Sequence, residues 1–339
     1  MSDLSKNQFQ VETEVQGVPW VPSFQLEVLH MPNCKLNAPQ GTLPSFLSYQ
    51  HDLQYLDLSN NKLVGVFPNW LLVNNINLRS LILDYNMFTG PFELPTYVDQ
   101  NPHPLYDLQI SNNKMAGNLP KHIGYILPNL IYLNVSGNGF DGSIPTSVGN
   151  MSNLYAFDLS RNNFSGEVPD SLWRSCASLG FLVLSHNSLW GQLFPSPLNM
   201  SQLELLFLDN NYFHGTLQHG ILELPYLEGL DISNNKLLGT VPDFISKFSS
   251  LHVINLSGIN FTACYVNMNH LVSLDLHSNN LVGSIPHMRK TGSFLAVLDL
   301  RDNNLSRKIP HWIDDRLQSL RALLLGGNHL QGHLPNRVS

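Results

Sequence analysis

The chain has 339 residues, of which 43% are hydrophobic and 13% are charged, and its formal net charge is −7. This composition is too apolar for a disordered chain, and it lacks the basic excess that would favour nucleic acid as a partner. Because no run of 18 apolar residues occurs and the first residues form no basic and apolar leader, we expect no membrane-spanning helix and no signal peptide in this chain.

One pattern recurs along the sequence, and it is clearest at Leu227, Leu230, Ile232, Asn235 and Leu237. It repeats mostly every 24 or 25 residues, twice after 27 and once after 20. A period of this length with this leucine spacing predicts a solenoid of leucine-rich repeats. The repeats open at Leu26, Leu53, Leu78, Leu105, Leu130, Leu154, Leu179, Leu203, Leu227, Leu251, Leu271, Leu295 and Leu320.

The two ends of the chain both fall within a repeat. Residues 1–25 hold a partial first repeat with Asn7, and Ser339 lies inside the last one. We therefore expect a single array over residues 1–339, uncapped at both ends and forming a fragment of a longer array. Uncapped coils expose apolar edges, so the isolated chain is expected to self-associate.

The leucine segment of each repeat alternates apolar and polar residues, which predicts a short strand with its leucines buried. Strands one period apart stack as a parallel sheet, and burial of each leucine contributes roughly 1.5–3 kcal/mol. The predicted fold is an α/β-type repeat solenoid, with a concave parallel sheet and short 3-10 or helical turns on the convex side.

An asparagine follows most of these strands, and we expect its amide to bond the turning backbone. Cys34 replaces it in one repeat and still fits a buried slot. Ile259 replaces it in another and cannot bond, so we expect the sheet to weaken between Leu251 and Leu271. The asparagines are Asn7, Asn61, Asn86, Asn113, Asn138, Asn162, Asn187, Asn211, Asn235, Asn279, Asn303 and Asn328.

The second half of most repeats contains Gly, an apolar residue and Pro, as in Gly142–Pro145 and Gly283–Pro286. This element resembles the plant class of extracellular leucine-rich repeats, which adds a second strand on one flank. The stretch from Trp20 to Leu26, followed by Cys34, is similar to ectodomains of plant receptor-like proteins. The resemblance implies a cell-surface scaffold for defence or developmental signalling, which binds a peptide or protein ligand and a co-receptor. It would reach the membrane only through a segment outside this chain.

Two other members of this repeat class remain as alternatives. One is a secreted inhibitor of wall-degrading enzymes, of the polygalacturonase-inhibitor type, and the other is the ectodomain of a receptor kinase. Ligand identity, and the choice between defence and development, stay open. The sequence contains no G-x-S-x-G, H-E-x-x-H, phosphate-binding glycine loop or C-x-x-C, so we expect neither an enzyme nor a cofactor.

Metal binding is not expected either. Three cysteines stand far apart, and His329 and His333 are separated by a turn. Aspartates recur at one exposed strand position and form an acidic stripe, which we interpret as a habit of the repeat. They are Asp57, Asp158, Asp231, Asp275 and Asp299.

Seven N-x-S/T sequons favour a secreted glycoprotein. Two of them fall on exposed strand positions, where a glycan would obstruct the concave face. The sequon asparagines are Asn134, Asn150, Asn163, Asn199, Asn255, Asn260 and Asn304, with Asn134 and Asn255 on strands.

The repeats opening at Leu179 and Leu203 depart from the usual polar outward residues. They place Phe181, Val183, Leu205 and Phe207 on the solvent face. Four adjacent apolar side chains form a patch of the size that marks contact sites. Coverage by a loop or glycan, or drift without function, is the alternative interpretation. The residues expected at the rim are Arg161, His186 and Asp209.

Overall fold

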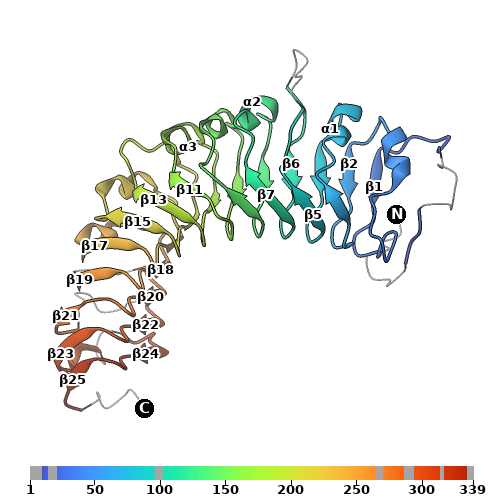
Figure 1. Cartoon of the computed structure of the whole chain (residues 1–339). Helices are drawn as coiled ribbons and strands as arrows, with labels where there is room; N and C mark the ends of the chain where they lie inside the picture. The colour runs from blue at the N-terminus through green and yellow to red at the C-terminus, as the bar shows by residue number, and fades with distance from the viewer. Residues whose placement is uncertain are drawn as a thin grey trace. The chain divides into compact units, whose positions relative to one another are not determined.

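The computed structural model describes residues 10–13, 21–95, 102–264, 270–285, 294–313 and 317–333. The chain forms two compact units, unit 1 over residues 1–179 and unit 2 over residues 180–339. In each unit, the repeats contribute strands to an inner parallel sheet and further strands to flanking sheets (Figure 1). The inner sheet is the one that the sequence predicts for the concave face.

The described residues of unit 1 form six inner strands, five flanking strands and five short helices. The inner strands are β1 (Val28–His30), β2 (Tyr55–Asp57), β4 (Ser80–Ile82), β6 (Asp107–Gln109), β8 (Tyr132–Asn134) and β10 (Ala156–Asp158). The flanking strands are β3 (Val64–Val66), β5 (Met87–Gly90), β7 (Lys114–Asn118), β9 (Gly139–Asp141) and β11 (Ser165–Glu167). The helices are η1 (Ser45–Tyr49), α1 (Trp70–Asn74), α2 (Ile123–Ile126), η2 (Thr146–Asn150) and α3 (Asp170–Ser175), where η marks a 3-10 helix.

In the described part of unit 2, seven inner strands and seven flanking strands alternate along the chain. The inner strands are β12 (Phe181–Val183), β14 (Leu205–Phe207), β16 (Gly229–Asp231), β18 (Val253–Asn255), β20 (Ser273–Asp275), β22 (Val297–Asp299) and β24 (Ala322–Leu324). The flanking strands are β13 (Ser188–Gln192), β15 (Tyr212–Gly215), β17 (Lys236–Val241), β19 (Asn260–Cys264), β21 (Val282–Gly283), β23 (Asn304–Lys308) and β25 (His329–Gln331). Two 3-10 helices are η3 (His219–Glu223) and η4 (Asp243–Lys247).

Each inner strand begins two residues after the leucine that opens its repeat. The strands pair in register, with Leu182 beside Leu206 and Leu206 beside Leu230. These central residues are at most 1% exposed, and they form the core on one side of the sheet. The alternation of the sequence therefore places every other side chain in the core, and the predicted fold class is confirmed.

The asparagine row joins neighbouring coils through its amides. Asn211 donates through Nδ2 to the carbonyls of Leu184 and Leu208 at 2.9 and 3.2 Å. Its Oδ1 accepts the N–H of Leu189 at 3.0 Å, so one side chain serves two repeats. Asn7 lies outside the described residues. The row is structural, as predicted.

The predicted weakening of the sheet around Ile259 is wrong. β18 and β20 pair over three residues, from Val253 beside Ser273 to Asn255 beside Asp275. The carbonyls of Ile232 and Leu256 still accept the Nδ2 groups of Asn235 and Asn279, so the bonds made by adjacent asparagines suffice. Ile259 itself is 3% exposed and packs in the core.

The irregularity falls instead in the flanking sheet. There the register of β17 against β19 shifts between Gly239 and Thr240. The shorter coil between Leu251 and Leu271 is therefore accommodated beside the inner sheet rather than within it.

At the other replaced position, Cys34 is 2% exposed, and its thiol donates to the carbonyl of Pro32 at 3.3 Å. Burial raises the pKa of this thiol. Residues 10–13 lie against the same coil, because Val11 accepts the N–H of Asn37 at 2.8 Å and Thr13 bonds the Asn37 side chain.

Candidate functional site

The four apolar residues predicted for a contact surface lie side by side in unit 2. β12 and β14 pair in parallel, with Phe181 beside Leu205 and Val183 beside Phe207. All four side chains are half-buried, so they expose less surface than the sequence predicts. We call these four residues the apolar patch. Its role as a contact surface stays a prediction.

The next strand, β16, extends the surface beside the apolar patch. Gly229 lies beside Leu205, and a Cβ added to this glycine would come within 2.7 Å of Leu205 Cδ2. The Leu205 side chain therefore leans over a position that has no side chain. Asp231 lies beside Phe207 and is half-buried. Gly229 was not assigned to the site from the sequence. The available signal was that β16 begins with a glycine, whereas β12 and β14 begin with the larger Phe181 and Leu205.

The polar end of the apolar patch is formed by the turns that follow β12 and β14. His186 Nε2 lies 3.6 Å from the Asp209 carboxylate, which also accepts the Ser185 hydroxyl and, at 2.6 Å, the Asn210 amide. His186 and Asp209 are thus brought together, as the rim prediction requires. Arg161 is exposed at the turn after β10 in unit 1, so its membership of the rim stays a prediction.

Negative charge dominates around the patch. Burial raises the pKa of the Asp231 carboxyl, two hydrogen bonds from Ser233 oppose that rise, and the nearby Asp209 charge adds to it. Asn255 Nδ2 donates to the same carboxylate at 2.9 Å and also lowers its pKa. The negative charge of Asp209 therefore raises the cost of ionising Asp231.

The acidic stripe has a structural explanation that runs through both units. Each of its five aspartates accepts the backbone N–H two residues later, at 2.8–3.0 Å, as Asp231 does from Ser233. Asn134 and Asn255 do the same at the equivalent position. This local bond holds the turn that ends each of these seven inner strands. It explains why the repeat favours Asp or Asn there without any ligand.

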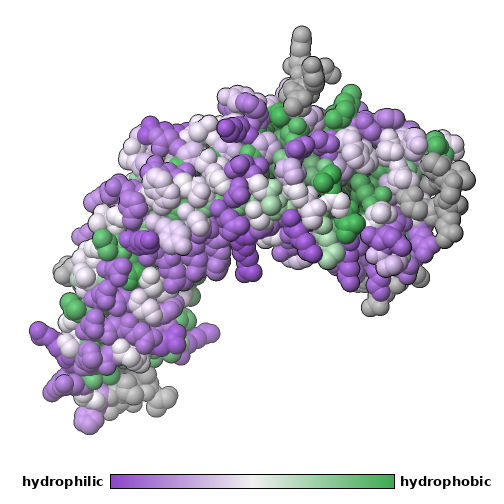
Figure 2. Space-filling model, viewed as in Figure 1, coloured by the Kyte–Doolittle hydropathy of each residue, from purple (hydrophilic) through white to green (hydrophobic). Residues whose placement is uncertain are grey.

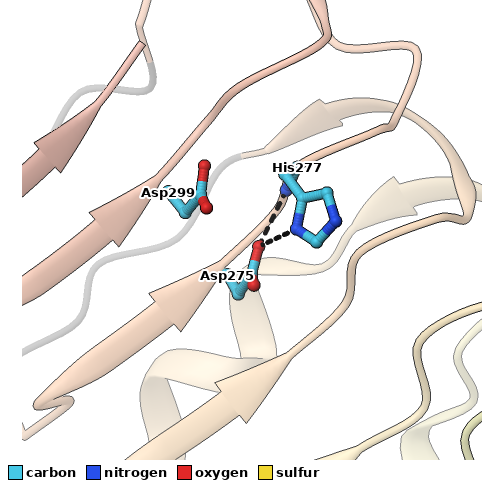
Figure 3. Close-up of side chains that lie close together, drawn as sticks. All are labelled: Asp275, His277 and Asp299. Carbon is cyan, nitrogen blue, oxygen red and sulfur yellow. Dashed lines mark hydrogen bonds and ion pairs between the residues drawn. The ribbon is translucent and has the colours of Figure 1, made fainter. Parts of the chain in front are cut away.

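Among the described residues, one group brings three potential metal ligands together. Asp275, His277 and Asp299 place one ligand atom each within 4.8 Å of one another (Figure 3). However, Arg301 bonds both oxygens of Asp299 through Nε at 3.0 Å, and its Nη2 lies 2.7 Å from Oδ2. His277 Nδ1 lies 2.7 Å from the Asp275 carboxylate.

The pKa of Asp299 reflects the same contacts. Burial would raise it, but the hydrogen bonds and charge of Arg301, with a smaller contribution from His277, lower it overall. The Arg301 cation already fills the place next to Asp299 that a metal would take. We therefore interpret the group as an ion pair between Arg301 and Asp299 beside a hydrogen bond between His277 and Asp275. His329 and His333 are both exposed, on β25 and just after it, and do not belong to this group.

The repeat geometry agrees with a known sequence family. The profile described as Leucine Rich Repeat matches residues 52–73, 129–151, 153–175, 226–248, 270–288 and 294–315. The chain contains leucine-rich repeats. Each matched segment of this leucine-rich-repeat protein contains one inner strand, from β2 in the first to β22 in the last.

The relatives of this leucine-rich-repeat protein include plant receptors. Receptor-like protein 14 of Arabidopsis thaliana is 43% identical over 277 residues, which cover 82% of this chain and 25% of that relative. The chain thus spans a quarter of that relative's length.

Two solved structures share the fold. The peptide hormone receptor RGFR1, in complex with RGF2, superposes with a TM-score of 0.76 and 30% identity over 87% of this chain and 47% of that one. The second is the ectodomain of the Arabidopsis thaliana receptor kinase GASSHO1/SCHENGEN3 in complex with CASPARIAN STRIP INTEGRITY FACTOR 2. It superposes with a TM-score of 0.76 and 33% identity, over 91% of this chain and 36% of that chain. The resemblance to plant receptor ectodomains is confirmed. Within the described residues, no helix is long and apolar enough to cross a membrane.

The sequons of this leucine-rich-repeat protein occupy three kinds of position. Asn163, Asn260 and Asn304 are exposed one residue after the position of the asparagine row, and Asn150 and Asn199 are exposed elsewhere on the coils. Asn134 and Asn255 are half-buried within inner strands, and each side-chain oxygen accepts hydrogen bonds from the serine two residues later. At Asn255, the Nδ2 atom that would carry a glycan donates to Asp231.

Proposed function

We propose that this leucine-rich-repeat protein is part of the ectodomain of a plant cell-surface receptor-like protein. It acts as a non-catalytic scaffold that recognises an extracellular peptide or protein, with a co-receptor as a further partner. The observation that carries the proposal is the apolar patch, four half-exposed apolar side chains on adjacent strands of a hydrogen-bonded sheet. Such a surface supplies apolar contact area with little ordering on binding. The 43% identity to a receptor-like protein supports the cell-surface assignment.

The non-catalytic role is supported by the bonds of the acidic groups beside the patch. Asp231 is held by Ser233 and Asn255, and Asp209 is held by Ser185 and Asn210. These carboxylates are held by neighbouring polar groups of the turns.

A displayed library of random peptides, panned on the purified full chain, tests the binding role. Selected peptides should bind the wild-type chain and lose roughly thirtyfold in affinity on Phe207→Ala, because truncation of a central aromatic residue costs about 2 kcal/mol. The matched control is Tyr226→Ala, an exposed aromatic residue of unit 2 outside the inner strands. Selected peptides that bind the Phe207→Ala chain as tightly as the wild type would contradict the proposal.

The cell-surface assignment has a separate test. Peptide mapping of the full-length protein from its own tissue should find N-glycans at exposed sequons such as Asn163 and Asn304. Unmodified asparagines at all exposed sequons would contradict passage through the secretory pathway.

A further inference from the structure

The segments of unit 2 that form the inner sheet near the apolar patch are acidic and contain neither lysine nor arginine. These segments are residues 180–187, 203–211, 227–235 and 251–259. Two histidines are their only basic side chains, and one of these, His186, already lies next to a carboxylate. Their ionisable residues are His186, Glu204, Asp209, Glu228, Asp231 and His252.

The flanking strands of unit 2 carry the opposite charge. The seven strands from β13 to β25 contain no aspartate or glutamate, and their charged residues are Lys236, Arg307 and Lys308. Lys236 lies over the ring of Tyr212, with Nζ 4.6 Å from the centroid. Figure 2 shows hydrophobic surface over the flanking strands around β17 to β21, next to hydrophilic surface. The flanking strands therefore do not share the acidity of the inner sheet, which does not simply follow from the net charge of −7.

The carboxylates lie at both ends of the apolar patch. Glu204 and Glu228 precede β14 and β16, and the Glu228 N–H donates to the Glu204 carbonyl at 2.8 Å, which places these residues side by side. Asp231 lies beside Phe207 at the other end, and Asp209 follows β14 there. Negative charge at both ends of an apolar surface favours an apolar ligand group between two cations.

We propose that the apolar patch binds a peptide segment in which an apolar or aromatic side chain is flanked by lysine or arginine. This inference rests on the proposed function and names the class of ligand. The apolar side chain packs on Phe181, Leu205 and Phe207. A flanking cation approaches Asp231 and Asp209, where it relieves the repulsion between the two carboxylates. A second cation approaches Glu204 and Glu228.

The test uses the same displayed library, with the residues next to the selected apolar positions read by sequencing. Lysine and arginine should be enriched there, and aspartate and glutamate depleted. Binding of the synthesised peptides should weaken with added salt, since the charges are partly exposed. Replacement of the flanking lysine with glutamine should lower the affinity about tenfold, the loss expected for one charge-assisted hydrogen bond.

The protein variants identify the partner of that lysine. Asp231→Asn removes the charge but keeps the oxygen that accepts the Ser233 N–H. This variant should also bind the lysine peptide about tenfold more weakly. Replacement of the peptide lysine with glutamine should then cause no further loss of affinity, because the two groups act as one pair. Glu204→Gln gives a second, half-buried variant that does not cap a turn. Asp57→Asn is the matched control in unit 1, because Asp57 holds the Ser59 N–H in the same way.

The outcomes separate the two proposals. Peptides that depend on Phe207 but have neutral or acidic flanks, and bind Asp231→Asn and Glu204→Gln chains normally, would overturn the charge inference and leave the binding role intact. Peptides that ignore Phe207→Ala would overturn both.

Discussion

Replacement of Asn211 by leucine tests the structural role of the asparagine row. Asn211 Oδ1 accepts the N–H of Leu189 at 3.0 Å, and leucine would leave this buried donor unpaired. The Leu184 carbonyl, which Asn211 also bonds, would keep a second donor, because Asn187 Nδ2 lies 3.1 Å from it. The main cost is therefore one buried unpaired N–H, and we expect the free energy of unfolding to fall by about 1–3 kcal/mol.

Urea unfolding of the full chain measures this effect, with Asn304→Ala as the control. Asn304 is exposed at the start of β23, so its replacement should change stability by less than about 0.5 kcal/mol. The dependence of the unfolding free energy on urea concentration (the m value) should stay the same in both variants, because neither changes the surface that unfolding exposes. A loss below about 0.5 kcal/mol for Asn211→Leu would refute the reasoning, and it would mean that the backbone ladder alone holds the coils together.

Two further changes have outcomes that follow from named contacts. The pKa of Asp84 is raised to about 6, because burial and the charges of Asp107 and Asp57 outweigh the hydrogen bonds from Ser111 that lower it. A carboxyl with a raised pKa stabilises the fold at low pH and loses this contribution between about pH 4 and pH 6. Thermal unfolding should therefore show Asp84→Asn to be more stable than wild type by about 1–3 kcal/mol at pH 7 and close to wild type at pH 4. An equal stability difference at both pH values would contradict this. Gly229→Ala should displace Leu205, because the added Cβ would lie 2.7 Å from Leu205 Cδ2. This variant should bind the selected peptide severalfold more weakly, with a stability change below about 1 kcal/mol. Unchanged peptide affinity in calorimetric titration would contradict the placement of Leu205 in the binding surface.

The positions of the inner strands could be predicted from the sequence because two periods coincide in it. Apolar and polar residues alternate along each strand with a period of two residues, which decides which side chains enter the core. The repeat of about 24 residues aligns equivalent positions on neighbouring strands. Residues such as Phe181 and Leu205 therefore lie side by side as predicted. The same logic could not give the exposure of the patch, since the shielding of each side chain depends on its neighbours in space.

The continuous ladder at Ile259 could not be predicted from a rule that treats each asparagine alone. Each carbonyl of this row is bonded by the asparagine of its own repeat and by that of the next repeat. The carbonyl of Ile232 therefore keeps the amide of Asn235, and the carbonyl of Leu256 keeps that of Asn279. The role of the aspartate stripe was likewise only partly visible. The aspartate carboxylates accept hydrogen bonds from backbone N–H groups of the following turn. These bonds depend on the backbone geometry of the turn, which could not be predicted from the sequence.

The most direct test of the central claim is the affinity of a selected peptide for the Phe207→Ala chain. Phe207 lies between Val183 and Asp231 on adjacent strands, so it occupies the middle of the proposed surface. Calorimetric titration should show a loss of roughly thirtyfold, and Phe181→Ala should behave similarly, whereas Asp57→Ala in unit 1 should change the affinity little. Unchanged affinity in both phenylalanine variants, with unchanged thermal unfolding, would contradict the assignment of ligand binding to the apolar patch.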